Sequence, residues 1–379
     1  MINSKNALII GAGIGGLTAA IALKQLGYEP VVYERAPEER ANGTTLVLWP
    51  NALRILEQWN LTDKVISLGV RNESMSVKTA TGRLLYELPL HSLENKYGLP
   101  VITLLRSDLQ RILIERLGME HINWGHELLT IEQDDQEARA YFTNGHSAKG
   151  RFLIGADGVH STVRPAIAAH VELRDCGYVA FRGMVHRTQS HLPPRQGIEF
   201  WGRGKRFGIF HTGNQGIYWF ATMNCQRDQN YSSNKEDLSL EFADWNPLVG
   251  EILCHTDPSK ILRHHIFDLP SLSTLTNGRF ALLGDAAHAM TPNLGQGACQ
   301  AIEDSGMLGE CLQHDNNIKA ALKQYEIQRL ARVRRIVNLS YRMGWVSQWS
   351  NPILCSLRNQ MFSAIPNRLK LQQLDRFLT

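Results

Sequence analysis

Three glycines near the start of the chain have the spacing of a turn that binds the phosphates of a dinucleotide. Gly11, Gly13 and Gly16 follow the apolar run 7–10 and precede small and aliphatic residues at helical spacing. The first glycine permits a tight turn, the second lets the backbone approach a pyrophosphate, and the third lets the helix pack on the strand. The sequence therefore predicts a strand, a turn and a helix whose positive end holds the phosphates.

An acidic residue ends the next apolar run, which is predicted to be the second strand of the unit. Glu34 follows the glycines at roughly the 20-residue spacing at which a carboxylate accepts a hydrogen bond from a ribose 2′-hydroxyl. A 2′-phosphate would be repelled by this carboxylate. We therefore expect the bound group to be the ADP half of FAD or NAD and not of NADP.

Two further aspartates end apolar runs later in the chain. Asp157 lies between Gly155 and Gly158 after the run 151–154, and Asp285 follows the run 279–283. Such an aspartate can cap a turn, but ligands of α/β proteins bind at the carboxyl ends of strands. Both readings remain open for Asp157.

A proline and two glycines precede a long helix that is predicted to end near residue 312. The segment contains Pro292, Gly295, Gln296, Gly297 and Ala298. Backbone amides at the start of a helix bind negative charge, so this segment is a candidate site for an anionic group.

Arg106 precedes an expected capping box, in which Ser107 is the N-cap and Gln110 is the reciprocal partner. An arginine beside a helix start is commonly no more than a solvated charge. Before this helix we expect a strand over 45–48, a helix from residue 50 and a hairpin over 74–79 and 83–88. Two antiparallel strands over 127–133 and 138–142 follow it.

The middle of the chain has a different pattern, that of an antiparallel sheet rich in aromatic residues. Its strands are expected over 178–185, 198–201, 206–211 and 217–223, with glycine-rich turns at 202–205 and 213–216. The glycines of 202–208 resemble a phosphate loop, but no helix follows and we discount it. A helix over 235–244 and a strand over 263–268 come next. After residue 319 the chain is predicted to be helical.

Composition describes a globular protein large enough for two domains. The chain has 379 residues, is 43% hydrophobic and carries a net charge of +4 without a block of like charge, which gives no argument for nucleic acid. Its six cysteines are scattered, as expected of buried reduced thiols and not of a metal site. No apolar run approaches the ~18 residues of a membrane span. We expect a cytoplasmic protein, with a C-terminal tail that packs on the body or, alternatively, lies on a membrane surface.

The three motifs together resemble the class A flavoprotein aromatic hydroxylases, the family of p-hydroxybenzoate and salicylate hydroxylases, over roughly residues 5–340. The resemblance implies an α/β fold with a Rossmann-type FAD-binding domain, an inserted antiparallel-sheet substrate domain and C-terminal helices. The FAD-binding domain would comprise 1–72, 100–175 and 270–315. The substrate domain would comprise 73–99 and 176–269, and the helical region 316–379.

The resemblance also implies a set of FAD-binding residues. The glycine turn and Glu34 would hold the ADP part, Arg106 the flavin or its phosphates, and Leu128 would border the adenine. Asp157 matches a motif used for both FAD and NAD(P)H, Asp285 one that binds the ribitol, and the segment from Gly295 would lie against the pyrimidine edge of the flavin. The full set is Gly11, Gly13, Ile14, Gly15, Gly16, Glu34, Arg35, Arg106, Leu128, Asp157, Asp285, Pro292, Gly295, Gln296, Gly297 and Ala298.

The activity that the resemblance implies is that of an FAD-dependent monooxygenase. NADH or NADPH would bind transiently without its own Rossmann unit and reduce the flavin, and O2 would form a flavin C4a-hydroperoxide. That species would hydroxylate or epoxidise a planar aromatic or conjugated small molecule. No metal, nucleic acid or stable membrane insertion is expected, and the protein would be a monomer or homodimer.

Within the family, residues 204–206 and 216–220 look most like the FAD-dependent urate hydroxylases. Arg206 and Tyr218 would then be the catalytic residues that bind the substrate. A solvated hairpin charge and a sheet-packing aromatic are the alternatives for these two. The acid that the urate branch has after the motif proline is Asn293 here, so a group that could assist deprotonation is missing.

Three other functions compete with this interpretation. A flavin halogenase would share the fold, but its tryptophan and Ile-Pro pattern is absent from this sequence. A flavin reductase or oxidase would release hydrogen peroxide without inserting oxygen. A protein that binds FAD or a ligand without turnover is the third alternative.

Overall fold

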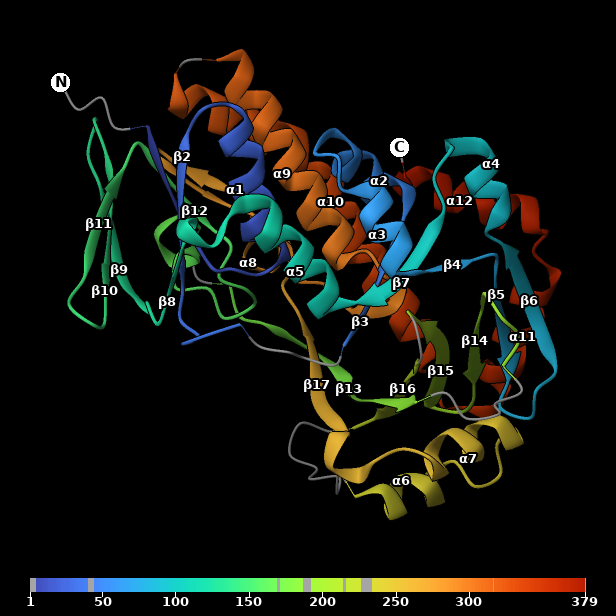
Figure 1. Ribbon diagram of the computed structural model, residues 1–379. Coiled ribbons are helices and arrows are strands. Elements are labelled where there is room, and N and C mark those ends of the chain that lie inside the picture. Colours follow the sequence, from blue (N-terminus) through green and yellow to red (C-terminus); the bar gives the residue numbers. More distant parts are fainter. Residues whose placement is uncertain are drawn as a thin grey trace.

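The computed structural model describes residues 5–39, 44–168, 171–186, 192–213, 216–225, 234–315 and 317–378. Two large sheets dominate it, and long helices lie across both (Figure 1). The first is a six-stranded sheet of order β18-β19-β12-β1-β2-β8, parallel except for β18. Its strands are β1 (Asn6–Ile10), β2 (Glu29–Glu34), β8 (Ile122–Trp124), β12 (Phe152–Gly155), β18 (Thr276–Asn277) and β19 (Phe280–Leu282).

Helices cover the six-stranded sheet because their inner faces are almost wholly apolar. In α1 (Ile14–Gln25) the nine residues that are buried include Leu17, Ile21 and Leu23. This helix packs between α5 (Arg106–Leu117) and α9 (Gly297–His314). The Thr18 hydroxyl lies 2.8 Å from that of Ser305, so even the polar groups between α1 and α9 are paired.

Two small antiparallel sheets extend this layer. One has the order β3-β7-β4 and the other β11-β10-β9. Their strands are β3 (Thr45–Leu48), β4 (Val70–Asn72) and β7 (Val101–Leu105), and β9 (Leu128–Gln133), β10 (Ala138–Phe142) and β11 (Ser147–Gly150). The helices near the first are α2 (Pro50–Gln58), α3 (Thr62–Leu68) and α4 (His91–Tyr97).

The second large sheet has seven strands in the order β17-β13-β16-β15-β14-β5-β6. They are β5 (Ser74–Thr79), β6 (Leu84–Pro89), β13 (Arg174–His186), β14 (Gln196–Trp201), β15 (Lys205–Thr212), β16 (Gly216–Asn224) and β17 (Leu262–Asp268). The expected hairpin is present as β5 and β6, and β5 joins the sheet by pairing in parallel with β14. The hairpin and the central strands, far apart in sequence, therefore form one surface.

The two faces of this sheet have different partners. Alternate residues, such as Phe207 on β15 and Trp219 on β16, pack with Phe242 in a core between the sheet and the helices α6 (Lys235–Glu241) and α7 (Pro247–Cys254). In Figure 1 these two helices lie below the sheet. The intervening residues, including Arg206 and Tyr218, point to the opposite face. That face is turned toward the C-terminal helices and the loops of the first sheet.

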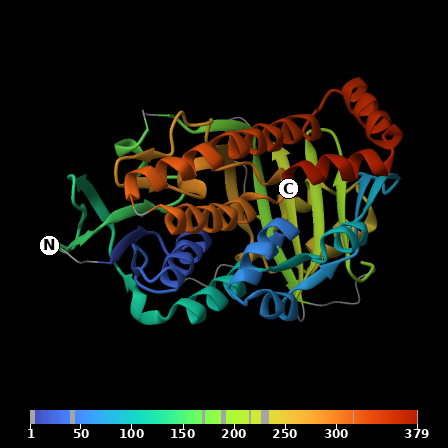
Figure 2. The same cartoon turned by 90° about the horizontal axis from the view of Figure 1, so that it is seen from above.

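Helix α10 (Ile318–Ser347) runs along both halves of the protein, as Figure 2 shows from above. The short α8 (Asp285–His288) lies at the end of β19. The tail folds as α11 (Pro352–Ala364) and α12 (Asn367–Leu378), which pack against β6. Within the described ranges, no helix has the length and apolar character that crossing a membrane requires.

The expected α/β architecture with an antiparallel sheet inserted in it is therefore observed. The prediction of a capping box at Ser107 is wrong. Helix α5 begins two residues earlier than predicted, at Arg106, after Leu105 in extended conformation, and no side chain caps it. The Gln110 side chain instead donates to the Ala12 carbonyl at 2.9 Å. The expected division into domains remains a prediction, and residues 214 and 215 of the expected turn lie outside the described ranges.

Candidate active site

The glycine turn between β1 and α1 has the geometry that the spacing predicted. Gly11 has φ of +105°, and a Cβ there would lie 2.4 Å from the Ala156 carbonyl oxygen. A Cβ on Gly16 would lie 1.8 Å from the Gly11 oxygen. Gly13 has space around it, because the nearest atom to its Cβ position is Arg106 Nη2 at 3.8 Å. Two glycines thus close the turn, and the third leaves room for a ligand.

The other motif residues of this turn pack inward. Ile14 is 5% exposed, and a Cβ on Gly15 would come within 2.7 Å of the Leu283 side chain. Both residues hold α1 against the loops that follow β19. They support the phosphate turn through packing.

The Glu34 carboxylate lies at the edge of a cavity of about 130 Å³. Its two oxygens accept hydrogen bonds from the Ala12 and Ala36 amides at 2.8 and 2.9 Å, which fixes their direction. The residues that line the cavity are Ala12, Gly13, Glu34, Ala36, Glu38, Arg106, Ser107, Gln110 and Trp124. The cavity has the polar acceptor and the open glycine that an adenosine diphosphate needs.

Two exposed charged side chains, Arg106 and Asp285, have no hydrogen bond or ion pair from their side chains to the described residues. Arg106, the first residue of α5, is exposed and lines the cavity, and no hydrogen bond or ion pair in the described parts of the chain engages its guanidinium. Asp285 is likewise exposed at the start of α8. Arg35 is exposed but does not line the cavity, and Leu128 is 8% exposed at the start of β9. Roles for these four in binding FAD stay predictions.

Asp157 caps the turn after β12. Its Oδ1 accepts from the Ser161 hydroxyl at 2.6 Å, and its Oδ2 accepts from the amides of Thr162 and Val163 at 2.7 and 3.1 Å. These contacts agree with the first role considered for Asp157, that of capping a turn. A contact with FAD or NAD(P)H remains a prediction.

The segment before α9 presents backbone atoms. Pro292 begins a 3₁₀ turn (Pro292–Leu294), and Gly295 follows in the left-handed region with φ of +60°. The Gln296 side chain is buried, and its Oε1 accepts from Asn51 and Gln300. Gly297 has no atom within 4 Å of its Cβ position. Gln296 therefore anchors the turn from inside and leaves only the main chain of residues 295–298 for a ligand.

Among the described residues, β3 and the start of α2 carry three buried polar atoms that have no hydrogen-bond partner, and the sequence did not predict them. They are Thr45 Oγ1, Trp49 Nε1 and Asn51 Oδ1, from β3 and the start of α2. The indole Nε1 lies 3.4 Å from the Cβ position of Gly295. Unpaired buried donors and acceptors are costly, so they indicate an absent ligand. A flavin, whose pyrimidine ring has both kinds of group, fits this set.

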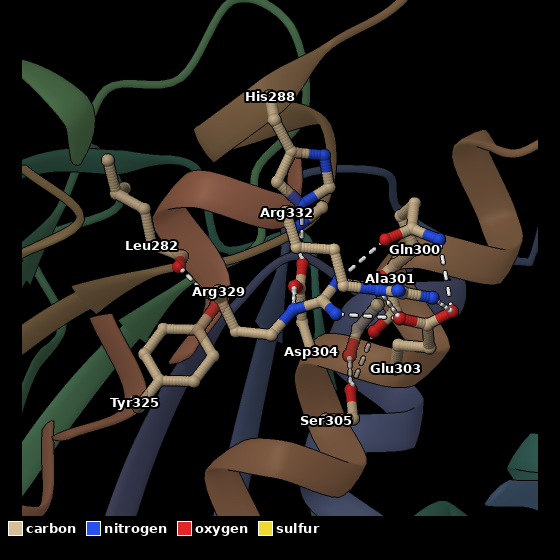
Figure 3. Close-up of polar contacts among 12 residues, drawn as sticks. Leu282, His288, Gln300, Ala301, Glu303, Asp304, Ser305, Tyr325, Arg329 and Arg332 are labelled. Atoms are coloured by element: carbon tan, nitrogen blue, oxygen red, sulfur yellow. Dashed lines mark hydrogen bonds and ion pairs between the residues drawn. The ribbon is translucent and has the colours of Figure 1, made fainter. Parts of the chain in front are cut away.

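A buried ionic network links α9 and α10 to the loop that follows β19 (Figure 3). Asp304 on α9 accepts from the Gly284 amide at 2.9 Å, lies 2.6 Å from His288 Nε2 and pairs with Arg329 Nε at 2.6 Å. Glu303 pairs with Arg329 and Arg332. Burial alone would raise the pKa of the Asp304 carboxyl, but the charges of His288 and Arg329 hold it below its ordinary value. The network joins α9, α10 and the loop after β19 as one unit.

Aromatic rings lie flat on the open face of the seven-stranded sheet. The rings of Phe210 and Phe220 are stacked at 6.2 Å. A Cβ on Gly197 or Gly208 would come within 2.6 or 2.1 Å of these two rings, so both glycines are required by the close approach. The result is an apolar surface suited to a planar ligand.

Tyr218 lies on the same face and is 9% exposed. Burial raises the pKa of its hydroxyl, against the opposing charge of Arg182. The described residues offer that hydroxyl no hydrogen bond. A neutral phenol is therefore free to bond a ligand. A substrate contact of Tyr218 stays a prediction.

Arg206 is 4% exposed and not the solvated charge that was the alternative. Its Nε donates to Glu199 Oε1 at 2.6 Å, and its Nη1 donates to Asn293 Oδ1 at 2.6 Å and to Ser347 Oγ at 2.7 Å. The guanidinium carbon lies 5.8 Å from the Phe220 ring centroid. The side chain thus joins the aromatic face to the segment that leads into α9.

Asn293 is held in one orientation by its neighbours. Its Nδ2 donates to Thr291 Oγ1, the Ser340 carbonyl and the Tyr178 hydroxyl at 2.8, 3.0 and 3.2 Å. Its Oδ1 is therefore the atom that faces Arg206. Asn293, at the position where the resemblance to the urate hydroxylases implies an acid, is thus a fixed amide that connects the sheet, α10 and the turn before α9.

Comparison with known proteins identifies relatives along almost the whole chain. A family model described as "FAD binding domain" matches residues 4–340. The FAD-dependent urate hydroxylase of Klebsiella pneumoniae is 35% identical over 335 residues, which is 87% of each chain. The aurachin C monooxygenase/isomerase of Stigmatella aurantiaca is 31% identical over 93% of this chain and 92% of its own.

The fold also matches solved structures. The crystal structure of Klebsiella pneumoniae HpxO complexed with FAD and uric acid superimposes with a TM-score of 0.94 at 31% identity. The match covers 98% of this chain and 96% of that one.

Proposed function

Because this chain belongs to the FAD-binding family of flavoprotein monooxygenases, we propose that it uses NAD(P)H and O2 to hydroxylate or epoxidise a planar aromatic or heterocyclic ring. The ring would bind between the Phe210 and Phe220 surface and the Gly295 turn. The observation that carries this is the 2.6 Å bond from Arg206 to Asn293. It joins the open face of the substrate sheet to the loop that begins α9.

The family and the α/β fold predicted from the sequence are confirmed by the comparisons. So is the prediction of an FAD-dependent enzyme that is an oxidoreductase. The alternatives of a halogenase and of a protein without turnover lose their support, since the two relatives compared above are named as a hydroxylase and a monooxygenase.

The residues that would hold FAD divide by the part of the cofactor that they suit. Gly13, Glu34 and Arg106 suit the adenosine diphosphate, and Asp285 suits the ribitol. The amides of 295–298, with Thr45 and Trp49, suit the pyrimidine ring. Bound FAD would accept electrons from NAD(P)H and activate O2. Amides at the start of α9 would stabilise negative charge there, because a helix N-terminus carries partial positive charge.

The other residues of the site orient the ring and exclude water. Tyr218 keeps its proton because burial raises its pKa, so it would donate a hydrogen bond to a ring oxygen or nitrogen. Arg206 would donate through its remaining nitrogen. Phe210 and Phe220 would cover the ring and keep the reacting position dry.

The nicotinamide cofactor would bind only transiently. One glycine turn of the dinucleotide type is present in the sequence, and FAD would occupy it. Glu34 would contact the FAD ribose and therefore does not select between NADH and NADPH. Asp157 would shape the turn that it caps, and its contact with FAD or NAD(P)H remains a prediction.

Urate is a less suitable substrate for this site than for the urate hydroxylases. The fixed amide of Asn293 cannot accept a proton from the ring. The named substrates of the two relatives differ from each other, so the family does not decide the ring. We assign the substrate class and not the compound.

The test is oxygen transfer by the purified holoenzyme. Urate, aromatic acids, quinolones and phenols would be screened for those that accelerate NAD(P)H oxidation, and products formed under ¹⁸O2 would be weighed by mass spectrometry. We expect one labelled oxygen atom in the product of an accelerating ligand. Hydrogen peroxide equal to the NAD(P)H consumed, with no labelled product from any ligand, would identify an oxidase instead.

Arg206→Ala serves as the companion variant. It should retain bound FAD and lose the acceleration by ligand, because Arg206 contacts the sheet and the Asn293 loop but not the glycine turn. Loss of FAD from this variant would contradict the placement of Arg206 in the ring site.

A further inference from the structure

A second charged residue, Glu199, is buried beside Arg206 and was not identified from the sequence. It lies on β14, is 7% exposed and points to the same face of the sheet as Arg206. Its Oε1 accepts from Arg206 Nε at 2.6 Å and from Trp201 Nε1 at 2.7 Å. The carboxylate therefore offsets the guanidinium charge at the place where the ring is proposed to bind.

Within the described parts of the chain, the pair leaves one donor and one acceptor without a protein partner. Nε and Nη1 of Arg206 are engaged by Glu199, Asn293 and Ser347, so Nη2 remains. Among the described residues, no hydrogen bond engages Glu199 Oε2. The two side chains keep 5% and 9% of their accessible surface. What the pair presents to the site is thus an N–H next to a carboxylate oxygen.

Other charges near the pair do not change this pattern. Arg358 is 1% exposed and donates to the Ser347 and Gly202 carbonyls, so its donors point away from a ligand. Its guanidinium lies over the Trp201 ring at 5.2 Å. The charge of Arg182 acts on the Tyr218 hydroxyl. Glu199 pairs with Arg206 and its charge also acts on Arg358, so a neutral residue in its place would leave the site more positive.

We propose that Glu199 determines the substrate specificity of the ring site by rejecting anionic rings and selecting a neutral ring that presents a carbonyl next to an N–H or O–H. This inference rests on the proposed function, because it assumes that the ring binds at Arg206. The carbonyl accepts from Arg206 Nη2, and the adjacent N–H or O–H donates to Glu199 Oε2. An anionic ring is disfavoured because it meets a carboxylate in a site shielded from water.

The test is equilibrium binding to the oxidised holoenzyme, measured by the change in the visible FAD spectrum. The probes are 2-quinolone, a neutral lactam, and quinoline-2-carboxylate, an anion on the same bicycle. The native protein should bind 2-quinolone more tightly. Glu199→Gln should shift the affinity ratio toward the carboxylate by about tenfold or more, the size of effect that one neighbouring charge has on an ionisation equilibrium.

Arg206→Gln is the opposing variant, which keeps the inference falsifiable if Glu199→Gln does not fold. It removes the cation and keeps Glu199, so the ratio should shift further toward 2-quinolone. Glu137→Gln is the matched control. Glu137 is 5% exposed and paired with Arg139 near the β9–β10 turn, so its loss should leave the ratio at the native value.

An unchanged ratio in folded, FAD-loaded Glu199→Gln would overturn the inference. Failure of native protein to respond to 2-quinolone, or tighter binding of quinoline-2-carboxylate by native protein, would do so as well. The proposed function fails by a different result, namely an absence of labelled oxygen in any product. Binding needs no turnover, so the two failures are distinguishable.

Discussion

The glycine turn and the ring-binding face depend on different features of their residues. The ring-binding face is the side of the seven-stranded sheet that carries Arg206, Tyr218, Phe210 and Phe220. At the turn, Gly11, Gly13 and Gly16 act through the atoms that they lack, because any Cβ meets backbone or occupies the space left for a ligand. At the face, Arg206, Glu199 and Asn293 act through side chains that come from three separate segments. The turn therefore tolerates few changes, whereas one side chain on the face can alter specificity without altering the fold.

The two regions also differ in how they treat polar groups. The side chains around the turn are either bonded to the backbone, as Glu34 is, or exposed, as Arg106 and Asp285 are. The face instead buries an arginine, a carboxylate and a phenol. Burial makes their mutual contacts strong and their mismatches costly. The turn would thus hold a cofactor mainly through exposed groups and the main chain, whereas the face would select a substrate through buried charges.

The largest effect is expected from Gly16→Ala, which tests the main-chain half of the comparison. The new Cβ would lie 1.8 Å from the Gly11 oxygen, so α1 must move away from β1. We expect the variant to lose bound FAD and about 3 kcal/mol of stability. Visible absorbance of the purified protein and thermal unfolding measure the two effects.

Gly13→Ala is the matched control for that variant. Its new methyl meets nothing closer than Arg106 Nη2 at 3.8 Å, so the FAD-free protein should unfold at the native temperature. FAD affinity should still fall by about tenfold, because the methyl occupies the approach of the pyrophosphate. Full FAD content and native stability in Gly16→Ala would refute the packing argument.

The next effect in size concerns the ionic network behind the flavin-side loops. In Asp304→Asn, Arg329 would lose one of its two buried carboxylate partners. We expect a loss of about 3 kcal/mol in urea unfolding, no more than for Gly16→Ala, since breaking a buried pair strands a charge. A weaker hold on FAD should accompany it, because Asp304 also accepts from the Gly284 amide.

An exposed pair supplies the contrast for this variant. Arg71 and Glu94 form an ion pair whose side chains are 49% and 33% exposed. Glu94→Gln should cost less than about 1 kcal/mol. Equal costs in the two variants would show that the network is not a support of the loops.

Tyr218→Phe tests whether a side chain on the ring-binding face contributes to substrate binding, and its expected effect is smaller. The lost hydroxyl has no partner among the described residues, so stability and FAD content should hardly change. The KM for an accepted ring should rise by about tenfold, the worth of one hydrogen bond from a buried group. Steady-state kinetics at saturating NAD(P)H provide the measurement.

Tyr325→Phe is the control, and it should lower the stability of the protein without changing KM. The Tyr325 hydroxyl donates to the Leu282 carbonyl at 2.9 Å, away from the ring-binding face. Its loss should cost about 1 kcal/mol of stability and leave KM unchanged. A fall in stability with unchanged KM in Tyr218→Phe would reduce Tyr218 to a packing residue.

A separate expected effect is on the pH dependence of stability. Burial alone would raise the pKa of Glu326, but hydrogen bonds from Lys323, Thr274 and the Leu275 amide lower it from 4.5 to about 2. A lowered pKa stabilises the folded protein above the ordinary value, and this contribution is lost as the pH falls from about 4.5 toward 2. The stability difference between native protein and Glu326→Gln should therefore shrink over that range in urea unfolding.

Glu38→Gln is the control for the pH experiment, because Glu38 is exposed at the cavity edge. Its stability should follow that of native protein at every pH. A difference between native protein and Glu326→Gln that stays constant down to pH 2 would contradict the role of this carboxylate.

Local sequence predicted the elements with strong periodicity. Most strands of the two large sheets, the hairpin and the long helices follow from alternation and helical spacing, which depend only on neighbouring residues, but the short edge strands β8 and β18 were not predicted. The capping box at Ser107 was wrong because a neighbouring element took its partner. Gln110 bonds the glycine turn, a contact between residues 98 positions apart.

The roles of single residues could be predicted only where a local pattern requires a particular residue type. The glycines and Glu34 could be assigned because a tight turn and a ribose-binding carboxylate require particular residue types at particular spacings. Glu199 could not, because a glutamate in the strand sequence Glu-Phe-Trp reads as a solvent-facing residue until another strand and helix cover it. Trp49 and Thr45 were missed for the same reason.

The sequence by itself determined where the backbone can turn and which strands and helices form, since sterics and periodicity act within a few residues. From its motifs it also indicated the family and the cofactor. The tertiary structure decided which charges are buried together. It brought Glu199, Arg206 and Asn293 into contact although they lie on separate segments, and only such contact sets the charge that a bound ring would meet.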